Sequence, residues 1–277
     1  MAGARVASQA AVKATSVLAD QVWRPPRGVV IVLYHRVGAR TPTAVDLPAP
    51  LFDEQMAWLA SRGLQISIDD ALSSLAGPVP SDAPSDPGPV VVTFDDGTAD
   101  LVEVALPILS QHRIPAVFYL ATDFIERSRP FPNDGVPLSW AAVREAVSTG
   151  LVTIGSHTDT HALLDRVDPA TAAAELDRSR TLIEDNVGVT PLDFAYPKAV
   201  AGTAEVEALV RARFRSAAVG GCRPNPYGRA DLHRLTRSAI QVNDGMRYFE
   251  RKARGGMALE DRLRRIVNRR RYANAVT

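Results

Sequence analysis

Three short stretches combine residue types that could carry out hydrolysis. They are residues 93–97 (TFDDG), residues 156–161 (SHTDTH) and residues 194–198 (FAYPK). A fourth, residues 33–35 (LYH), brings a further histidine. Each stretch follows or ends an apolar run that is typical of a buried strand. Functional side chains of parallel α/β folds gather at the carboxyl ends of the strands, so we expect the four stretches to converge.

His157 and His161 are candidates for metal ligands. Spaced by four residues, they could meet on one face of a helical turn. Two histidines and a carboxylate, with one position open to water, are common in hydrolytic metal sites. By themselves, the two histidines could equally be surface or helix-capping residues.

Asp95 and Asp96 are the candidate carboxylates. Adjacent residues at a strand end direct their side chains differently, so one could bind a metal ion while the other stays free as a base. The alternative is structural, because Asp-Gly is a strong turn signal and either aspartate could cap a following helix.

The elements that must position these residues alternate along the chain. Continuous apolar runs at 29–33 and 90–94 predict strands buried on both faces. Strands alternating with helices predict a parallel α/β fold, either an open sheet or a closed barrel. The further predicted elements are strands at 66–68, 116–120, 152–155, 194–196, 216–219 and 239–242, and helices at 52–61, 69–76, 101–112, 140–148, 169–187 and 204–213.

Composition narrows the class of protein. The chain has 277 residues, of which 46% are hydrophobic and 23% charged, with a formal net charge of +1. These values are typical of a globular protein and do not suggest a nucleic-acid partner. One cysteine, Cys222, excludes a disulfide within the chain. We find neither a signal peptide nor a transmembrane run, so we expect a cytoplasmic location.

Taken together, TFDDG and SHTDTH resemble the metal-site motifs of the polysaccharide deacetylase family, also called the NodB-homology or carbohydrate esterase 4 family. Residues 33–37 and 114–120 strengthen the resemblance, which runs from about 29 to 249. It implies a single-domain distorted (β/α) barrel of about seven strands. The catalytic domain would cover 28–255, with a motif core at about 88–245.

The resemblance also implies an activity. The protein would remove N-acetyl groups from an amino-sugar polysaccharide or lipid-linked glycan, as a hydrolase of non-peptide carbon–nitrogen bonds. Asp96, His157 and His161 would hold a divalent ion, with zinc expected ahead of cobalt, nickel or manganese. Asp95 would be the general base.

The general acid has two candidates. Many family members supply it from a Leu-x-His motif near the C-terminus, where this chain has only Leu232-His233. Leu33-Tyr34-His35 matches the motif at the other end of the chain, as in a permuted branch of the family. We therefore expect His35 to be the acid in preference to His233.

The third motif departs from the family pattern. Ala195 stands where relatives have an arginine that orients the base, and Lys198 replaces an aromatic residue. The backbone around Tyr196, Pro197 and Lys198 could still stabilise an oxyanion. We expect Arg237 to supply the missing guanidinium from another strand. The alternative is a carbohydrate-binding protein that keeps the fold with impaired catalysis.

The two ends of the chain are expected to lie outside the catalytic domain. Residues 1–27 would form a helical extension and residues 256–277 a basic helix or tail. The tail arginines could attract an anionic membrane surface, or could simply be a solvated helix face. These arginines are Arg262, Arg264, Arg265, Arg269, Arg270 and Arg271.

Overall fold

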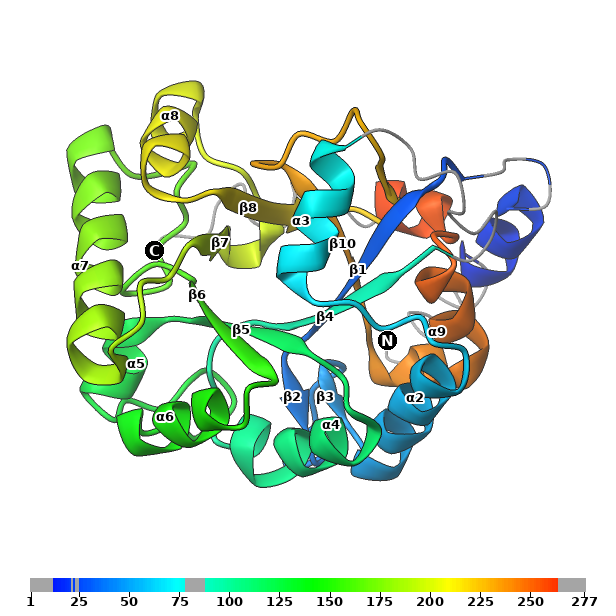
Figure 1. Cartoon of the computed structure of the whole chain (residues 1–277), viewed down its shortest axis with the longest axis horizontal. Helices are drawn as coiled ribbons and strands as arrows, with labels where there is room; N and C mark the ends of the chain where they lie inside the picture. Colours follow the sequence, from blue (N-terminus) through cyan, green and yellow to red (C-terminus); the bar gives the residue numbers. More distant parts are fainter. Residues whose placement is uncertain (1–11, 21, 23–24, 78–87, 264–277) are drawn as a thin grey trace, which may run out of the picture.

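The protein is a closed α/β barrel, seen in a computed structural model that describes residues 12–20, 22, 25–77 and 88–263 (Figure 1). Within these residues, seven parallel strands form the barrel wall. In order around the barrel they are β1 (Gly28–Tyr34), β4 (Val90–Phe94), β5 (Ala116–Leu120), β6 (Val152–Ser156), β7 (Asp193–Ala195), β8 (Ser216–Gly220) and β10 (Leu235–Ala239).

Strand β1 closes the barrel. It pairs with β4 on one side, where Val32 lies opposite Val92, and with β10 on the other, where Val32 lies opposite Ser238. All its residues are buried, because the packed barrel interior covers one face and helices cover the other. The expected α/β fold class is thus confirmed. Of the open sheet and the closed barrel that the sequence allowed, the structure has the closed barrel.

Helices surround the wall, and α3 closes one end of it. The α-helices are α2 (Ala49–Ser61), α3 (Ile68–Ala76), α4 (Leu106–His112), α5 (Thr122–Glu126), α6 (Trp140–Ser148), α7 (Pro169–Val187), α8 (Ala204–Arg213) and α9 (Gly245–Ala253). Helix α3 packs its apolar face against Val29, Ile31 and Val91 inside the barrel. Its Asp69 pairs with Arg215, the residue before β8. The amino-terminal end of the barrel is therefore covered, and the carboxyl end is left for the site.

Several shorter elements lie outside the seven-stranded wall. Strands β2 (Arg36–Val37) and β3 (Asp46–Leu47) pair with each other, and β9 (Asn225–Pro226) runs antiparallel to β1. A π-helical segment, η1 (Leu101–Ala105), precedes α4, and two 3₁₀ turns are η2 (Pro197–Ala199) and η3 (Val242–Asp244).

Several element boundaries differ from the sequence-based predictions. The last barrel strand is β10, ending at Ala239, whereas the apolar run at 239–242 predicted a strand that begins there. Residues 66–68 are not a strand: Gln65 makes an isolated bridge to Val90, and Ile68 already begins α3. Ser67 caps that helix by accepting the Asp70 N–H. The two strand boundaries depend on pairing partners, which local propensity does not encode.

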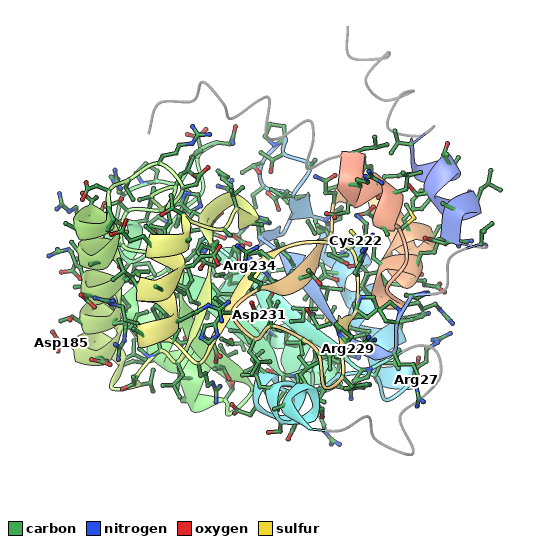
Figure 2. The ribbon with its side chains drawn as sticks, turned by 90° about the horizontal axis from the view of Figure 1, so that it is seen from above. Arg27, Asp185, Cys222, Arg229, Asp231 and Arg234 are labelled. Carbon is green, nitrogen blue, oxygen red and sulfur yellow. The ribbon has the colours of Figure 1, made fainter. Side chains whose placement is uncertain are left out.

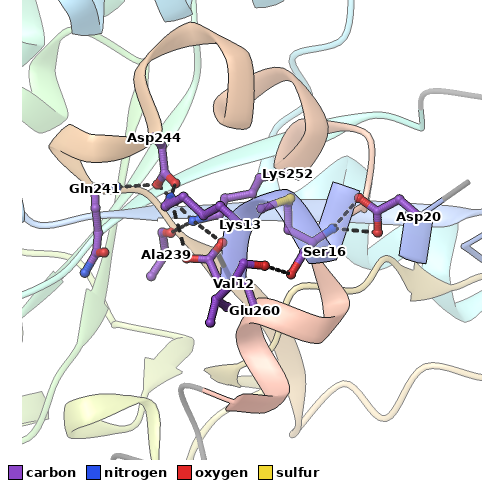
Figure 3. A network of polar contacts seen from close by, with 10 residues as sticks. Val12, Lys13, Ser16, Asp20, Ala239, Gln241, Asp244, Lys252 and Glu260 are labelled. Carbon is purple, nitrogen blue, oxygen red and sulfur yellow. Dashed lines mark hydrogen bonds and ion pairs between the residues drawn. The ribbon is translucent and has the colours of Figure 1, made fainter. Parts of the chain in front are cut away.

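The segment at residues 12–20 packs beside the residues that follow β10 (Figures 1 and 3). The described residues 12–20 are helical, and Lys13 pairs with Asp244 and Glu260. Asp20 accepts the Met257 backbone N–H at 2.9 Å. The proposed division at 27/28 and 255/256 remains a prediction, although residues on both outer sides of it contact the barrel.

The basic tail lies mostly outside the described residues. Arg262 is described and exposed, and the other tail arginines, from Arg264 onward, are not. The expected membrane contact therefore stays a prediction. None of the described helices has the length and apolar character needed to cross a bilayer.

Candidate metal centre

The carboxyl ends of β4 and β6 bring an aspartate and two histidines together. Asp96 Oδ1 lies 3.8 Å from His157 Nε2 and 3.5 Å from His161 Nε2. The three potential ligand atoms lie within 4.8 Å of one another. One carboxylate and two imidazole nitrogens at this spacing form a donor set that suits zinc and related divalent ions.

His157 is held in the orientation that a metal ligand needs. Its Nδ1 lies 2.7 Å from the Ala195 carbonyl oxygen, which can only accept, so Nδ1 carries the proton. The lone pair of Nε2 is then free and faces Asp96. The residues present therefore fit a divalent ion.

The backbone of the site is strained into the left-handed region. Asp96 has φ 75°, Thr158 φ 65° and His161 φ 64°. Non-glycine residues adopt this conformation at a cost, and such positions cluster at functional sites. His157 and His161 thus lie in a loop after β6, and the helical turn that their spacing suggested is not formed.

Side chains from two neighbouring helices hold this loop. Glu175 of α7 accepts the backbone N–H groups of Asp159 and Thr160, at 3.0 and 2.8 Å. Thr122 of α5 donates its hydroxyl to Asp159 Oδ1 at 2.8 Å. Sequence analysis missed Glu175 and Thr122, because a lone polar residue on an amphipathic helix looks like any solvated position.

Asp95 lies beside the three candidate ligands and is held by Arg237. The guanidinium of Arg237 donates to both carboxylate oxygens, at 2.6 and 2.8 Å, and both side chains are almost completely buried. Burial acts to raise the pKa of Asp95, but the charge and hydrogen bonds of Arg237, together with His157 and His35, keep the pKa below its ordinary value. Asp95 is therefore an ionised, oriented carboxylate whose Oδ2 is 3.8 Å from His157 Nε2.

The two candidate acids lie at opposite ends of the barrel. His35 directly follows β1, and its buried Nδ1 has no hydrogen-bond partner among the described residues. Burial lowers its pKa, against the charges of Asp96 and Asp95, which act to raise it. His35 is thus among the site residues.

His233 precedes β10 and lies near the amino-terminal end of the barrel. Its Nε2 is 2.8 Å from the Phe214 carbonyl oxygen, and its backbone N–H donates to Asp231. Asp231 and Arg234, which lie close to it in the sequence and are labelled in Figure 2, are exposed. His233 is held in a surface network of its own.

Residues of the third motif, at 196–198, lie partly in the core and partly at the surface of the site. The Tyr196 ring is buried in an apolar cluster with Phe194 and Val206, so its side chain is directed away from the site. Pro197 is buried, whereas Lys198 is exposed and has φ 54°. Of the three, Lys198 is the residue whose side chain is free to meet a ligand.

Electrostatics couple these residues into one site. Burial lowers the pKa of His161 to about 3, with Lys198 and His157 contributing in the same direction. For Asp96, burial acts to raise the pKa, but the neighbouring histidines and Lys198 hold it well below its ordinary value. An anionic Asp96 facing neutral His161 is the protonation state that metal binding requires.

A partly buried Asp/His/His cluster at the carboxyl end of an α/β barrel, with a second aspartate beside it, is typical of hydrolytic metal sites. The sequence model of the family described as polysaccharide deacetylase matches residues 82–216. Over this segment, which holds the first three motifs, the chain is similar to the polysaccharide deacetylase family.

Individual proteins show the same similarity. The poly-β-1,6-N-acetyl-D-glucosamine N-deacetylase of Escherichia coli K12 is 31% identical over 156 residues, which cover 52% of this chain. This chain covers only 22% of that protein's length.

Solved structures share the fold. IcaB from Ammonifex degensii has a TM-score of 0.70 at 23% identity and covers 83% of this chain and 98% of its own. The Streptococcus pyogenes deacetylase PplD, solved with acetate, has a TM-score of 0.67 at 20% identity, covering 80% of this chain and 96% of its own.

Proposed function

We propose that this protein is a metal-dependent hydrolase that removes N-acetyl groups from an amino-sugar glycan, either a polysaccharide or a lipid-linked precursor. One observation carries the proposal: Asp95 is a buried, ionised carboxylate beside the Asp/His/His cluster. A protein that only binds carbohydrate does not need a second aspartate beside a metal site. A hydrolase needs one as its general base. The similarity to an E. coli deacetylase of a β-1,6-linked polymer supports the substrate class.

Asp96, His157 and His161 would hold the ion, for which zinc is the first choice. When bound, a divalent ion supplies Lewis acidity, polarising a carbonyl and lowering the pKa of water to about 7. Asp95 would take a proton from the attacking water, whose oxygen adds to the acetamide carbon. Arg237 positions Asp95 with both oxygens engaged, so one carboxylate orientation persists. Arg237 thereby performs the role of the arginine that Ala195 replaces.

The carbon–nitrogen bond breaks only if the nitrogen receives a proton, because an amine anion is a very poor leaving group. His35 is the residue we assign to this step. Its lowered pKa makes the imidazolium a stronger acid but reduces the fraction that is protonated at neutral pH. The backbone around Pro197 and Lys198 would stabilise negative charge on the acetamide oxygen. The cytoplasmic location expected from the sequence remains a prediction.

The test is acetate release. Protein loaded with zinc, cobalt, nickel or manganese is incubated with oligomers of β-1,4- and β-1,6-linked N-acetylglucosamine, and acetate is quantified. We expect release from at least one glycan, and Asp95→Asn to reduce the rate by about 10²–10⁴-fold, the usual contribution of a general base.

Two measurements make the result interpretable. Metal content must stay the same in Asp95→Asn, since the ligands are other residues. Asp185→Asn, an exposed aspartate on α7 (Figure 2), is the matched control and should keep wild-type activity. Bound glycan with no acetate from any substrate or metal would favour the carbohydrate-binding alternative.

A further inference from the structure

Lysine is scarce in this chain, and the three lysines have different surroundings. The sequence has 32 basic residues, of which only Lys13, Lys198 and Lys252 are lysines. Lys13 and Lys252 are buried and both pair with Asp244, as Figure 3 shows. Lys198 is exposed. It is therefore the lysine whose amine is available to solvent and to a ligand.

Lys198 lies at the open side of the metal centre. It sits in η2, directly after β7, whose last residue, Ala195, accepts the hydrogen bond from His157. The open side is where Asp96 and His161 are exposed, by 19% and 17% of their side chains. The charge of Lys198 is felt by Asp96, His161 and His35. Lys198 is thus an exposed, charged residue on a segment next to the metal centre.

No acidic side chain in the described part of the chain forms an ion pair with Lys198, including Asp96. Asp95 is already neutralised by Arg237. The two aspartates and Arg237 leave the site with one formal negative charge, and a divalent ion turns this into one positive charge. Lys198 adds a second positive charge that the bound ion repels.

An acetamide is neutral, so hydrolysis itself gives Lys198 no partner. Resting on the proposed function, we propose that Lys198 makes the site select a glycan that carries an anionic group, a carboxylate or a phosphate, beside the N-acetylated sugar. A lysine ammonium is a flexible point charge that binds either anion without demanding a fixed geometry. Attraction between the lysine ammonium and an anionic glycan also raises the rate at which protein and glycan associate. This attraction weakens as the salt concentration rises.

Binding can be tested without turnover, because Lys198 should be the reactive lysine. The zinc-loaded protein is treated with a limiting amount of an amine-acetylating reagent, and modification is located by peptide mass spectrometry, which also separates the N-terminal amine. We expect Lys198 to react at least ten times faster than Lys13 and Lys252. A hyaluronan tetrasaccharide (carboxylate) and UDP-N-acetylglucosamine (phosphate) report which anion protects Lys198, with neutral chitotetraose as the reference.

Activity provides the second measurement. kcat and KM for acetate release are compared between the neutral and the two anionic probes, in wild type, Lys198→Met and Lys198→Arg. We expect the anionic-to-neutral ratio of kcat/KM to exceed about five, mostly through KM, and to fall towards one in Lys198→Met and at 0.5 M salt. Lys198→Arg should keep the preference because it keeps the charge.

The outcomes separate the two proposals. Charge selection is overturned if neutral and anionic probes protect Lys198 equally, or if Lys198→Met leaves the ratio of kcat/KM unchanged. Acetate release in the same experiment still upholds the proposed function. Selective protection without acetate from any probe upholds anion selection by Lys198 and overturns the deacetylase activity.

Discussion

His35 and His233 show how a single residue's place in the barrel decides its role. His35 is part of a Leu-x-His motif. His233 directly follows a leucine, without the intervening residue. In a parallel barrel, a residue after a strand lies at the carboxyl end and a residue before a strand lies at the other end. His35 follows β1, and His233 precedes β10. The geometry therefore favours His35 as the acid.

Substituting each histidine by alanine tests this choice. We expect His35→Ala to lower kcat for acetate release by about 10²–10⁴-fold, the contribution of a general acid, with zinc content unchanged. His233→Ala removes contacts to Phe214 and Arg211 at the surface, so kcat should stay within about twofold of wild type. If His233→Ala were the more damaging variant for kcat at equal folding, our assignment of the acid would be wrong.

At the scale of elements, the position of His157 depends on how closely β6 approaches its neighbours. Gly155, two residues before His157, has no space for a side chain. A Cβ at this position would lie 2.5 Å from the Tyr119 ring and 2.8 Å from the Asp193 carbonyl oxygen. A backbone carbonyl in the adjacent strand cannot move without displacing that strand. Gly155 thus allows β6 to lie where its end directs His157 at Asp96.

We expect Gly155→Ala to lower the free energy of unfolding by about 1–3 kcal/mol, the usual cost of overpacking, and to weaken zinc binding as well. Chemical denaturation and zinc titration measure the two effects. Gly77→Ala is the matched control, because a Cβ there would meet its nearest atom at an ordinary 3.6 Å. Unchanged zinc affinity in a destabilised Gly155→Ala would show that β6 packing does not position the ligand.

At the scale of the whole molecule, a buried ion cluster joins the helical segment at residues 12–20 to the residues that follow β10. Asp244 lies between Lys13 and Lys252, and Lys252 also donates to the Ala239 carbonyl oxygen at 2.9 Å (Figure 3). Burial acts to raise the pKa of Asp244, but the two lysines outweigh it and lower the pKa. Lys13 is 231 residues from Asp244 in the sequence, so the cluster exists only in the folded chain.

The lowered pKa fixes the direction of a pH effect. A carboxylate whose pKa is lower in the folded state contributes stability above its unfolded pKa, about 4, and loses it as pH falls through the folded value. We expect Asp244→Asn to lose about 3–5 kcal/mol at pH 7, because two buried ammonium groups lose their closest carboxylate and keep the more distant Glu260, at 3.6 and 3.7 Å. Below about pH 4, the gap between wild type and variant should narrow. Denaturation at pH 7, 5 and 3 measures it, and a gap that widens towards pH 3 would contradict the expectation.

The sequence by itself predicted the alternation of strands and helices and the closeness of the first two motifs. These follow from local patterns, since apolar runs mark strands and parallel strand ends share one edge. The candidate ligands Asp96, His157 and His161 were implied by the family resemblance. Only the tertiary structure decided that the barrel closes, where the last strand lies, and that Glu175 holds the histidine loop. It also placed Arg237 on Asp95, although the two are 142 residues apart. Such contacts depend on the register and packing of distant segments, which no local pattern encodes.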